Sequence, residues 1–322
     1  MPVAKLPLVI IPTPIHRLNN LSSEIGVDLW IKRDDLTGFA MGGNKGRKLE
    51  YLIADALKEG ATVVVTCGSR QSNFVRQLGA ACAMHGLRCV AAVMDLPFDS
   101  AAGKPRGAHP SGGGNEILNH WLGVELHHFP DDDWEVLYQY AETLAFALES
   151  KGETVYRIPV GGSSPLGALS FYEAGREMLA QGVKIATVVT ASSSGSTQVG
   201  LTYALASEGV KVVGIVSDPE PEIVHDFVKI GEGLAELLGV KPLGPNAFLL
   251  DFDSVGPGYG VSSPEGEEAI RLMATREGIF LDPVYSGKAF AGLLRLARKG
   301  KLEGPVLFWH TGGMPTLFAT AD

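Results

Sequence analysis

Lys45 stands in the glycine-rich stretch Gly42-Gly43-Asn44-Lys45-Gly46-Arg47-Lys48, directly before an apolar pattern that is typical of a helix. A lysine amine that is held on such a turn, partly screened from water and beside other cations, loses its proton more easily and attacks aldehydes. Lys45 is therefore a candidate Schiff-base lysine. Taken alone, an ordinary surface turn explains the stretch better, so the assignment depends on a second site that binds an anion.

A second stretch has the composition of such an anion site. Ala191-Ser192-Ser193-Ser194-Gly195-Ser196-Thr197-Gln198 follows an expected strand and opens an expected helix. Small residues let the backbone curl around an anion, and amides, hydroxyls and the helix N-terminus supply donors and partial positive charge. The stretch predicts a phosphate cup; a solvated loop with Ser196 or Thr197 as a helix cap is the alternative.

Gly68-Ser69-Arg70-Gln71-Ser72-Asn73 occupies an equivalent place, after one expected strand and before a helix. Its hydroxyl, amide and backbone donors suit a substrate carboxylate, whereas a simple helix cap is about equally consistent with the stretch. We therefore take Gln71, Ser72 and Asn73 as candidate substrate-binding residues.

Two tyrosines and one threonine complete the candidates. Tyr259 and Tyr285 lie on turns flanked by Gly or Pro. A phenol beside a cationic lysine acts as an acid or base if its pKa is lowered, although most tyrosines simply pack. Thr311 follows an expected strand, at the end where open α/β sheets bind ligands, and it either contacts a cofactor ring or caps a turn.

The elements that must position these residues alternate along the chain. Short β-branched runs and helical patterns follow one another from Lys48 almost to the end, which predicts an α/β fold of open, twisted, mainly parallel sheets with helices on both faces. The expected strands are 61–66, 88–94, 124–129, 154–158, 186–190, 211–216, 248–252 and 305–309. One expected helix begins just after Lys45. The others span 71–85, 132–150, 166–181, 197–207, 222–238, 264–277 and 287–299. A loop rich in small residues is expected at 99–114.

Composition excludes several classes of protein. The 322 residues are 45% hydrophobic, and 27 basic against 36 acidic residues give a net charge of -9, so the sequence offers no basic surface for nucleic acid. Apolar runs are too short for a membrane span and no secretory pattern opens the chain, so we expect a cytoplasmic protein. Three cysteines without C-x-x-C spacing and scattered histidines predict neither disulfides nor a metal site.

The order of these motifs resembles the 1-aminocyclopropane-1-carboxylate deaminase and D-cysteine desulfhydrase family, whose members use pyridoxal 5'-phosphate on a tryptophan-synthase-β-like fold. The resemblance extends from Thr13-Pro14 and Ile31-Lys32-Arg33-Asp34-Asp35-Leu36-Thr37-Gly38 to His310-Thr311-Gly312-Gly313. It implies that Lys45 holds the cofactor, that Asn73 approaches its phenolic oxygen and that Tyr259 and Tyr285 are catalytic. It also implies a phosphate cup formed by Ser194, Gly195, Ser196 and Thr197.

Three departures from the family pattern bear on the substrate. Ser286 stands where cyclopropane deaminases have a glutamate that contacts the pyridine nitrogen, and Thr311 stands where desulfhydrase-like members use a threonine. Phe74 replaces a polar residue. Arg70 replaces an apolar residue, and it either attracts an acidic substrate group or points to solvent. The resemblance then implies α,β-elimination from a small amino acid to give pyruvate and ammonia.

D-Cysteine is the first expected substrate, with L-cysteate and 1-aminocyclopropane-1-carboxylate as alternatives. A non-catalytic amino-acid-binding protein is the alternative of another class, and a nucleotide-dependent oxidoreductase is disfavoured because no acidic residue follows a glycine fingerprint. We expect a large cofactor-binding domain formed by 1–45 and 156–322, a small domain formed by 46–155, and a homodimer.

Overall fold

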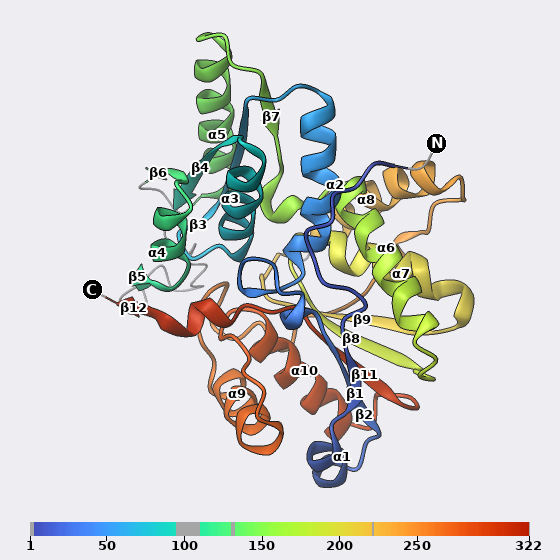
Figure 1. Cartoon of the computed structure of the whole chain (residues 1–322). Coiled ribbons are helices and arrows are strands. Elements are labelled where there is room, and N and C mark those ends of the chain that lie inside the picture. Colours follow the sequence, from blue (N-terminus) through green and yellow to red (C-terminus); the bar gives the residue numbers. More distant parts are fainter. Residues whose placement is uncertain (1–2, 95–109, 130–132, 221, 322) are drawn as a thin grey trace.

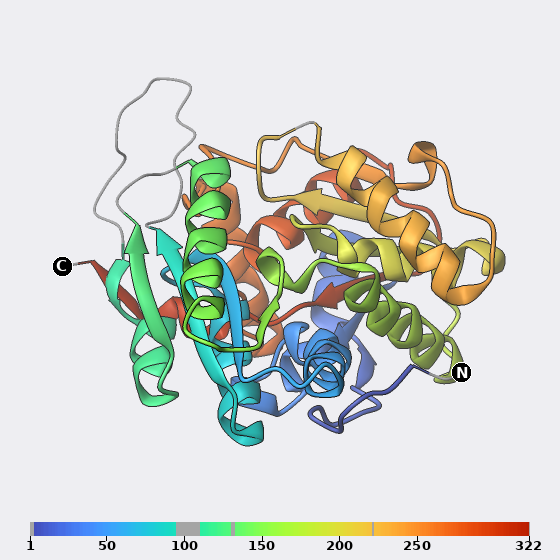
Figure 2. The same cartoon turned by 90° about the horizontal axis from the view of Figure 1, so that it is seen from above.

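The computed structural model describes residues 3–94, 110–129, 133–220 and 222–321. Within these ranges two open sheets, of six and four strands, lie side by side with helices on both faces, and a third sheet has only two strands (Figure 1). Figure 2, turned by 90°, shows the small sheet and its helices on one side of the molecule and the yellow-green to light-orange helices of the large sheet on the other. The predicted α/β architecture of two mainly parallel sheets is confirmed.

The large sheet has six strands, of which only the edge strand β1 is antiparallel to its neighbour. Their order is β1 (Ile15–Arg17), β2 (Leu29–Arg33), β11 (Val306–His310), β8 (Thr187–Ser192), β9 (Lys211–Val216) and β10 (Leu249–Asp251). The small sheet is entirely parallel, in the order β6 (Glu125–Phe129), β4 (Arg88–Met94), β3 (Val63–Ser69) and β7 (Val155–Arg157). Because β7 pairs with β3, the small sheet extends two residues beyond the domain boundary expected at 155.

Ten α-helices lie within the described ranges: α1 (Asn19–Ile25), α2 (Lys45–Lys58), α3 (Asn73–His85), α4 (Gly114–Trp121), α5 (Trp134–Glu149), α6 (Pro165–Ala180), α7 (Ser196–Leu205), α8 (Ile223–Leu238), α9 (Pro264–Glu277) and α10 (Ser286–Arg298). Ser164 and Ser263 cap α6 and α9 with their hydroxyls, and a proline follows each cap, which is why these helices begin where they do.

Strand β11 illustrates why helices cover both faces of the large sheet. Successive side chains of a strand point to opposite faces. Phe308 packs against Phe290 of α10, with ring centroids 5.3 Å apart, whereas Trp309 packs against Phe171 of α6 on the other face. The alternation places a separate apolar core on each side of the sheet.

The expected loop at 99–114 is partly wrong. Residues 95–109 lie outside the described part of the chain, but Pro110–Gly113 forms strand β5, which pairs antiparallel with the last strand, β12 (Ala319–Ala321) (Figure 1). Helix α4 follows at once. Gly114, the first residue of α4, also lies close to β12, since a Cβ on it would approach the Cβ of Ala319 to 3.2 Å.

Candidate active site

A cavity of about 1120 Å³ opens between the two sheets, at the carboxyl ends of β3, β8 and β11. In parallel sheets ligands bind at this end of the strands. Nine of the site residues predicted from the sequence line the cavity, and they come from segments far apart in the chain: Lys45, Ser72, Asn73, Ser194, Gly195, Thr197, Tyr259, Tyr285 and Thr311.

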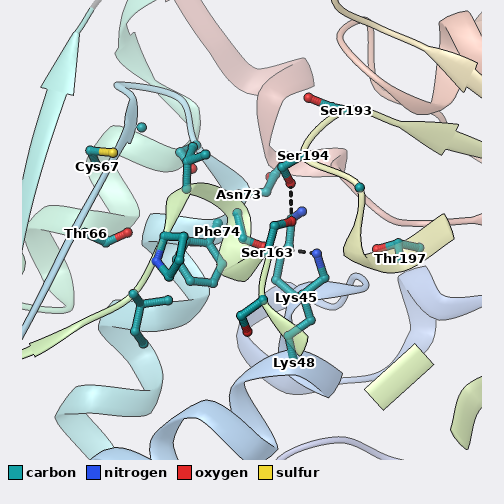
Figure 3. Close-up of a pocket in the computed structure, with 18 of the residues that line it drawn as sticks. Lys45, Lys48, Thr66, Cys67, Asn73, Phe74, Ser163, Ser193, Ser194 and Thr197 are labelled. Carbon is teal, nitrogen blue, oxygen red and sulfur yellow. Dashed lines mark hydrogen bonds between the residues drawn. The ribbon is translucent and has the colours of Figure 1, made fainter. Parts of the chain in front are cut away.

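Lys45 is the first residue of α2, and the loop before it has an unusual backbone. Ala40, Met41, Gly42 and Gly43 all have positive φ. A Cβ on Gly42 would lie 1.9 Å from the carbonyl oxygen of Asp35, and the amide of Asn44 donates to the carbonyl of Thr311 at 2.9 Å. The glycines are therefore required by close backbone contacts, and the loop directs Lys45 into the cavity (Figure 3).

Burial lowers the pKa of Lys45 to about 8, so this amine loses its proton much more easily near neutral pH than an exposed lysine does. Lys48 contributes to the same environment and was missed by the sequence analysis. It lies one turn further along α2, is 1% exposed, lines the cavity and donates to the carbonyl of Gly161 at 3.0 Å. Burial and the neighbouring Lys45 lower the pKa of Lys48 well below its ordinary value. The i,i+3 spacing of two lysines was the available signal.

The serine-rich loop after β8 forms a cup at the start of α7. Gly195, with φ +99°, is the residue before the helix, and a Cβ on it would overlap the ring of Phe227 at 2.5 Å. Ser163, a second residue that the sequence analysis missed, donates to the hydroxyl of Ser194 at 2.7 Å and lies 3.1 Å from that of Ser196 (Figure 3). Ser196 is fully buried and is not among the cavity-lining residues, so its hydroxyl supports the cup from behind.

Opposite the cup, helix α3 brings Ser72 and Asn73 to the cavity. The hydroxyl of Ser72 accepts from the amide of Val75, which makes it the helix cap as well as a lining residue. Gln71 does not join them. Its side chain accepts from the amide of Asn115 at 2.9 Å and donates to the carbonyl of Gly112, so it anchors the turn into α4 instead of facing the cavity.

Tyr259 and Tyr285 meet through their hydroxyls at one wall of the cavity. Burial raises the pKa of Tyr259 to about 12, and burial together with Tyr259 raises the pKa of Tyr285 well above its ordinary value. The lowered phenol pKa that the sequence hypothesis required is therefore wrong for this structure. Both phenols keep their protons near neutral pH, so neither is a base there, both can donate hydrogen bonds, and Lys45 is the better base.

The first turn of α10 holds both tyrosines in place. The Asp282 carboxylate accepts from the amides of Val284, Tyr285 and Ser286 at 2.8–2.9 Å. Lys288 donates to the carbonyls of Val255 and Gly258, next to Tyr259, at 2.7 and 2.6 Å. One helix start therefore fixes the relative position of the two phenols.

Of the other residues that bear on the substrate, two line the cavity and two do not. Thr311 and Phe74 line the cavity, but the hydroxyl of Ser286 is buried against Asp282. Arg70 does not line the cavity; its side chain is 23% exposed and its guanidinium forms an ion pair with Glu116 of α4 at 2.8 Å. Within the described ranges, no group of His, Cys, Asp or Glu side chains could hold a metal ion, and no helix is long and apolar enough to cross a membrane.

Comparison with known proteins gives consistent matches over nearly the whole chain. A family model described as "Pyridoxal-phosphate dependent enzyme" matches residues 6–312. A Pyrococcus horikoshii protein named "Putative 1-aminocyclopropane-1-carboxylate deaminase" is 41% identical over 99% of this chain and 96% of its own length. The crystal structure of an ACC deaminase homologue superposes with a TM-score of 0.89 at 40% identity, covering 98% of this chain and 93% of that one. A hydrogen sulfide-producing enzyme from Fusobacterium nucleatum shares only the fold, with a TM-score of 0.67 at 16% identity, covering 95% of this chain and 97% of that one.

Proposed function

This chain belongs to the family of pyridoxal-phosphate-dependent enzymes, in its group of 1-aminocyclopropane-1-carboxylate deaminase-like members. From that premise we propose that it is a lyase that acts on D-cysteine. The observation that carries the proposal is the presence of Lys45, the serine cup and the neutral Thr311 hydroxyl in one cavity. The products would be pyruvate, ammonia and hydrogen sulfide.

The cavity fits the cofactor. A Cβ on Gly161 would lie 2.6 Å from the hydroxyl of Ser194 and 3.5 Å from Nζ of Lys45, so only glycine leaves the space between cup and amine open. Hydroxyls, the N-terminus of α7 and Lys48 suit a phosphate, while Lys45 suits an aldehyde. When bound, pyridoxal phosphate supplies the electron withdrawal that labilises the α-proton of an amino acid.

The side chains around the cavity would then divide the work. Ser72 and Asn73 would hold the substrate carboxylate, and the neutral amine of Lys45 would accept the α-proton. The protonated phenols of Tyr259 and Tyr285 would donate hydrogen bonds to the leaving sulfur. Thr311 lines the cavity, whereas the hydroxyl of Ser286 is bonded to Asp282. Thr311 is therefore the residue that would face the cofactor ring, and its neutral hydroxyl would add no charge there.

The charge at the cavity mouth favours a neutral leaving group over a sulfonate. Acidic side chains predominate among the charged residues that line the outer cavity: Asp133, Glu135, Glu142, Asp218, Glu220 and Asp226, against Arg157 and Lys229. An excess of negative charge slows the entry of anionic substrates. Arg70, the residue that could have favoured L-cysteate, is paired with Glu116 outside the cavity.

Ammonia release from a panel of amino acids tests this proposal, because the four carbons of 1-aminocyclopropane-1-carboxylate would give 2-oxobutanoate in place of pyruvate. We expect D-cysteine to exceed L-cysteine, L-cysteate and 1-aminocyclopropane-1-carboxylate in kcat/KM by at least roughly tenfold. Preferred turnover of 1-aminocyclopropane-1-carboxylate would instead support the activity for which the Pyrococcus horikoshii relative is named. Binding of D- and L-amino acids without release of ammonia from any of them would favour the non-catalytic alternative.

Gly161→Ala is expected to weaken pyridoxal phosphate binding by roughly tenfold, because the new methyl group displaces Ser194, a donor to the anion. Gly209→Ala is the matched control. Its φ of +69° is similar to the +66° of Gly161, but a Cβ there meets nothing within 4 Å. Both variants should lose about 1–2 kcal/mol of stability from the backbone, whereas only Gly161→Ala should lose cofactor in equilibrium dialysis. Equal cofactor affinity in the two variants would contradict the prediction.

The division into a large domain of 1–45 and 156–322 and a small domain of 46–155, a homodimeric state and a cytoplasmic location complete the proposal. Limited proteolysis and light scattering of the purified protein test the first two.

A further inference from the structure

Arg76, on the first turn of α3, is a buried cation without an anionic partner. Its side chain is 1% exposed, and no carboxylate of the described residues lies within 4.0 Å of it. Burial lowers the pKa of Arg76 to about 10, which still leaves the guanidinium charged near neutral pH. An arginine buried in this way is costly, so its contacts indicate what it is retained for.

The guanidinium contacts three groups around the active site. Nη1 donates to Oδ1 of Asn73 at 2.8 Å and to Oδ1 of Asn115, while Nη2 donates to the carbonyl of Gly42 at 3.2 Å. Gly42 belongs to the loop that directs Lys45, and Asn73 lines the cavity. Arg76 therefore joins the start of α3 to the lysine-bearing loop, from behind the cavity wall.

These contacts determine which end of the Asn73 amide faces the cavity. A guanidinium offers only donors, so the group that Asn73 turns toward Arg76 must be its carbonyl oxygen. Nδ2 of Asn115 donates to the same oxygen at 3.0 Å, and Asn115 is itself held by the backbone of Gln71. With Oδ1 engaged by two donors, the N–H group of Asn73 is the end left to the cavity.

We propose that Arg76 is a positioning residue that turns the Asn73 amide so that its N–H faces an anionic oxygen of the bound cofactor or substrate, with the guanidinium charge supporting that oxygen from behind. The inference rests on the proposed function, since it assigns how one residue of that site is oriented. It also accounts for Gln71, whose side chain and carbonyl hold Asn115 in the same network.

Pyridoxal phosphate affinity and the absorbance spectrum of the loaded protein test the role of Arg76. Arg76→Met should weaken pyridoxal phosphate binding by roughly tenfold and shift the visible absorbance maximum, because the amide is free to rotate and the supporting charge is gone. Arg76→Lys, which keeps a charged donor, should recover part of both. Gln77 also lines the cavity and donates to the Gly42 carbonyl at 2.8 Å, so Gln77→Met removes a contact to the same loop without touching Asn73 and should change both signals less than Arg76→Met does.

A folded Arg76→Met protein with wild-type affinity and spectrum would overturn the inference. If that variant does not fold, Asn115→Asp decides. A carboxylate there gives Arg76 a counter-charge and removes a donor to Asn73, so an unchanged affinity and spectrum would overturn it too. Normal cofactor binding by the wild type without pyruvate from any amino acid would reject the proposed substrate alone, and a changed Arg76→Met spectrum would still support the role of Arg76.

Discussion

Lys45→Ala is expected to abolish pyruvate release, with kcat/KM lower by roughly 10⁴-fold or more. The Lys45 amine is the group that lines the cavity next to the serine cup and has a pKa lowered to about 8 by burial. Its loss removes both the covalent attachment of the cofactor and the base. Stopped assays for pyruvate and an absorbance spectrum of the purified variant measure the two effects separately.

Two control variants sharpen this test. Lys58→Ala changes an exposed lysine at the other end of the same helix and should leave both signals unchanged. Lys48→Ala keeps the attachment residue but removes a neighbouring buried amine, so it should lower cofactor affinity while retaining the absorbance of lysine-bound cofactor. Wild-type turnover by Lys45→Ala would refute the assignment of the site.

Arg47→Met is expected to lower the free energy of unfolding by about 3–5 kcal/mol, because it removes one partner of a buried charge network. The Arg47 guanidinium donates to Asp34 at 2.9 Å and to Glu177 at 2.9 Å, and both Arg47 and Asp34 are almost fully buried. Urea unfolding followed by circular dichroism measures the loss. Arg88→Met, at an exposed ion pair with Glu125, should cost no more than about 1 kcal/mol. A similarly small cost for Arg47→Met would contradict this account of α2.

The same network makes stability depend on pH. Burial alone would raise the pKa of Glu177, but hydrogen bonds and attraction from Arg47 and Lys32 outweigh it and lower this pKa to about 2, from 4.5. A carboxylate with a depressed folded-state pKa stabilises the fold above its unfolded value and loses that contribution as the pH falls. Wild-type stability should therefore drop between about pH 5 and pH 2, and Glu177→Gln should flatten part of that drop.

The sequence predicted the elements with clear patterns well. The strands at 88–94 and 211–216 and the helix at 264–277 have the expected bounds, because β-branched runs and a Ser-Pro cap mark them locally. Among site residues, the sequence pointed to Lys45 and the serine loop because glycine-rich and serine-rich turns between elements have local signatures.

The missed features depend on contacts between distant segments. Strand β2 contains Lys32 and Arg33, and no periodicity shows that Lys32 is fully buried against Glu177. Ser163 is identified only by its contact with Ser194 of the serine cup, and Lys48 only by its contact with the carbonyl of Gly161. Both contacts join segments that are distant in the sequence. The position of Gln71 just before a helix predicts a substrate-binding residue, but its long side chain instead accepts a hydrogen bond from the amide of Asn115 in α4.

The pairing of β12 with β5 ties the C-terminal residues to the side of the molecule that carries the small sheet. Only a short segment separates this pair from Thr311 and Gly312 at the cavity floor. A hinge rotation that moved the small sheet away from the large one would either break the β5–β12 pair or displace the segment that contains Thr311 and Gly312. A tag appended after β12 could disturb the same pair, so an N-terminal tag is the safer choice for kinetic work.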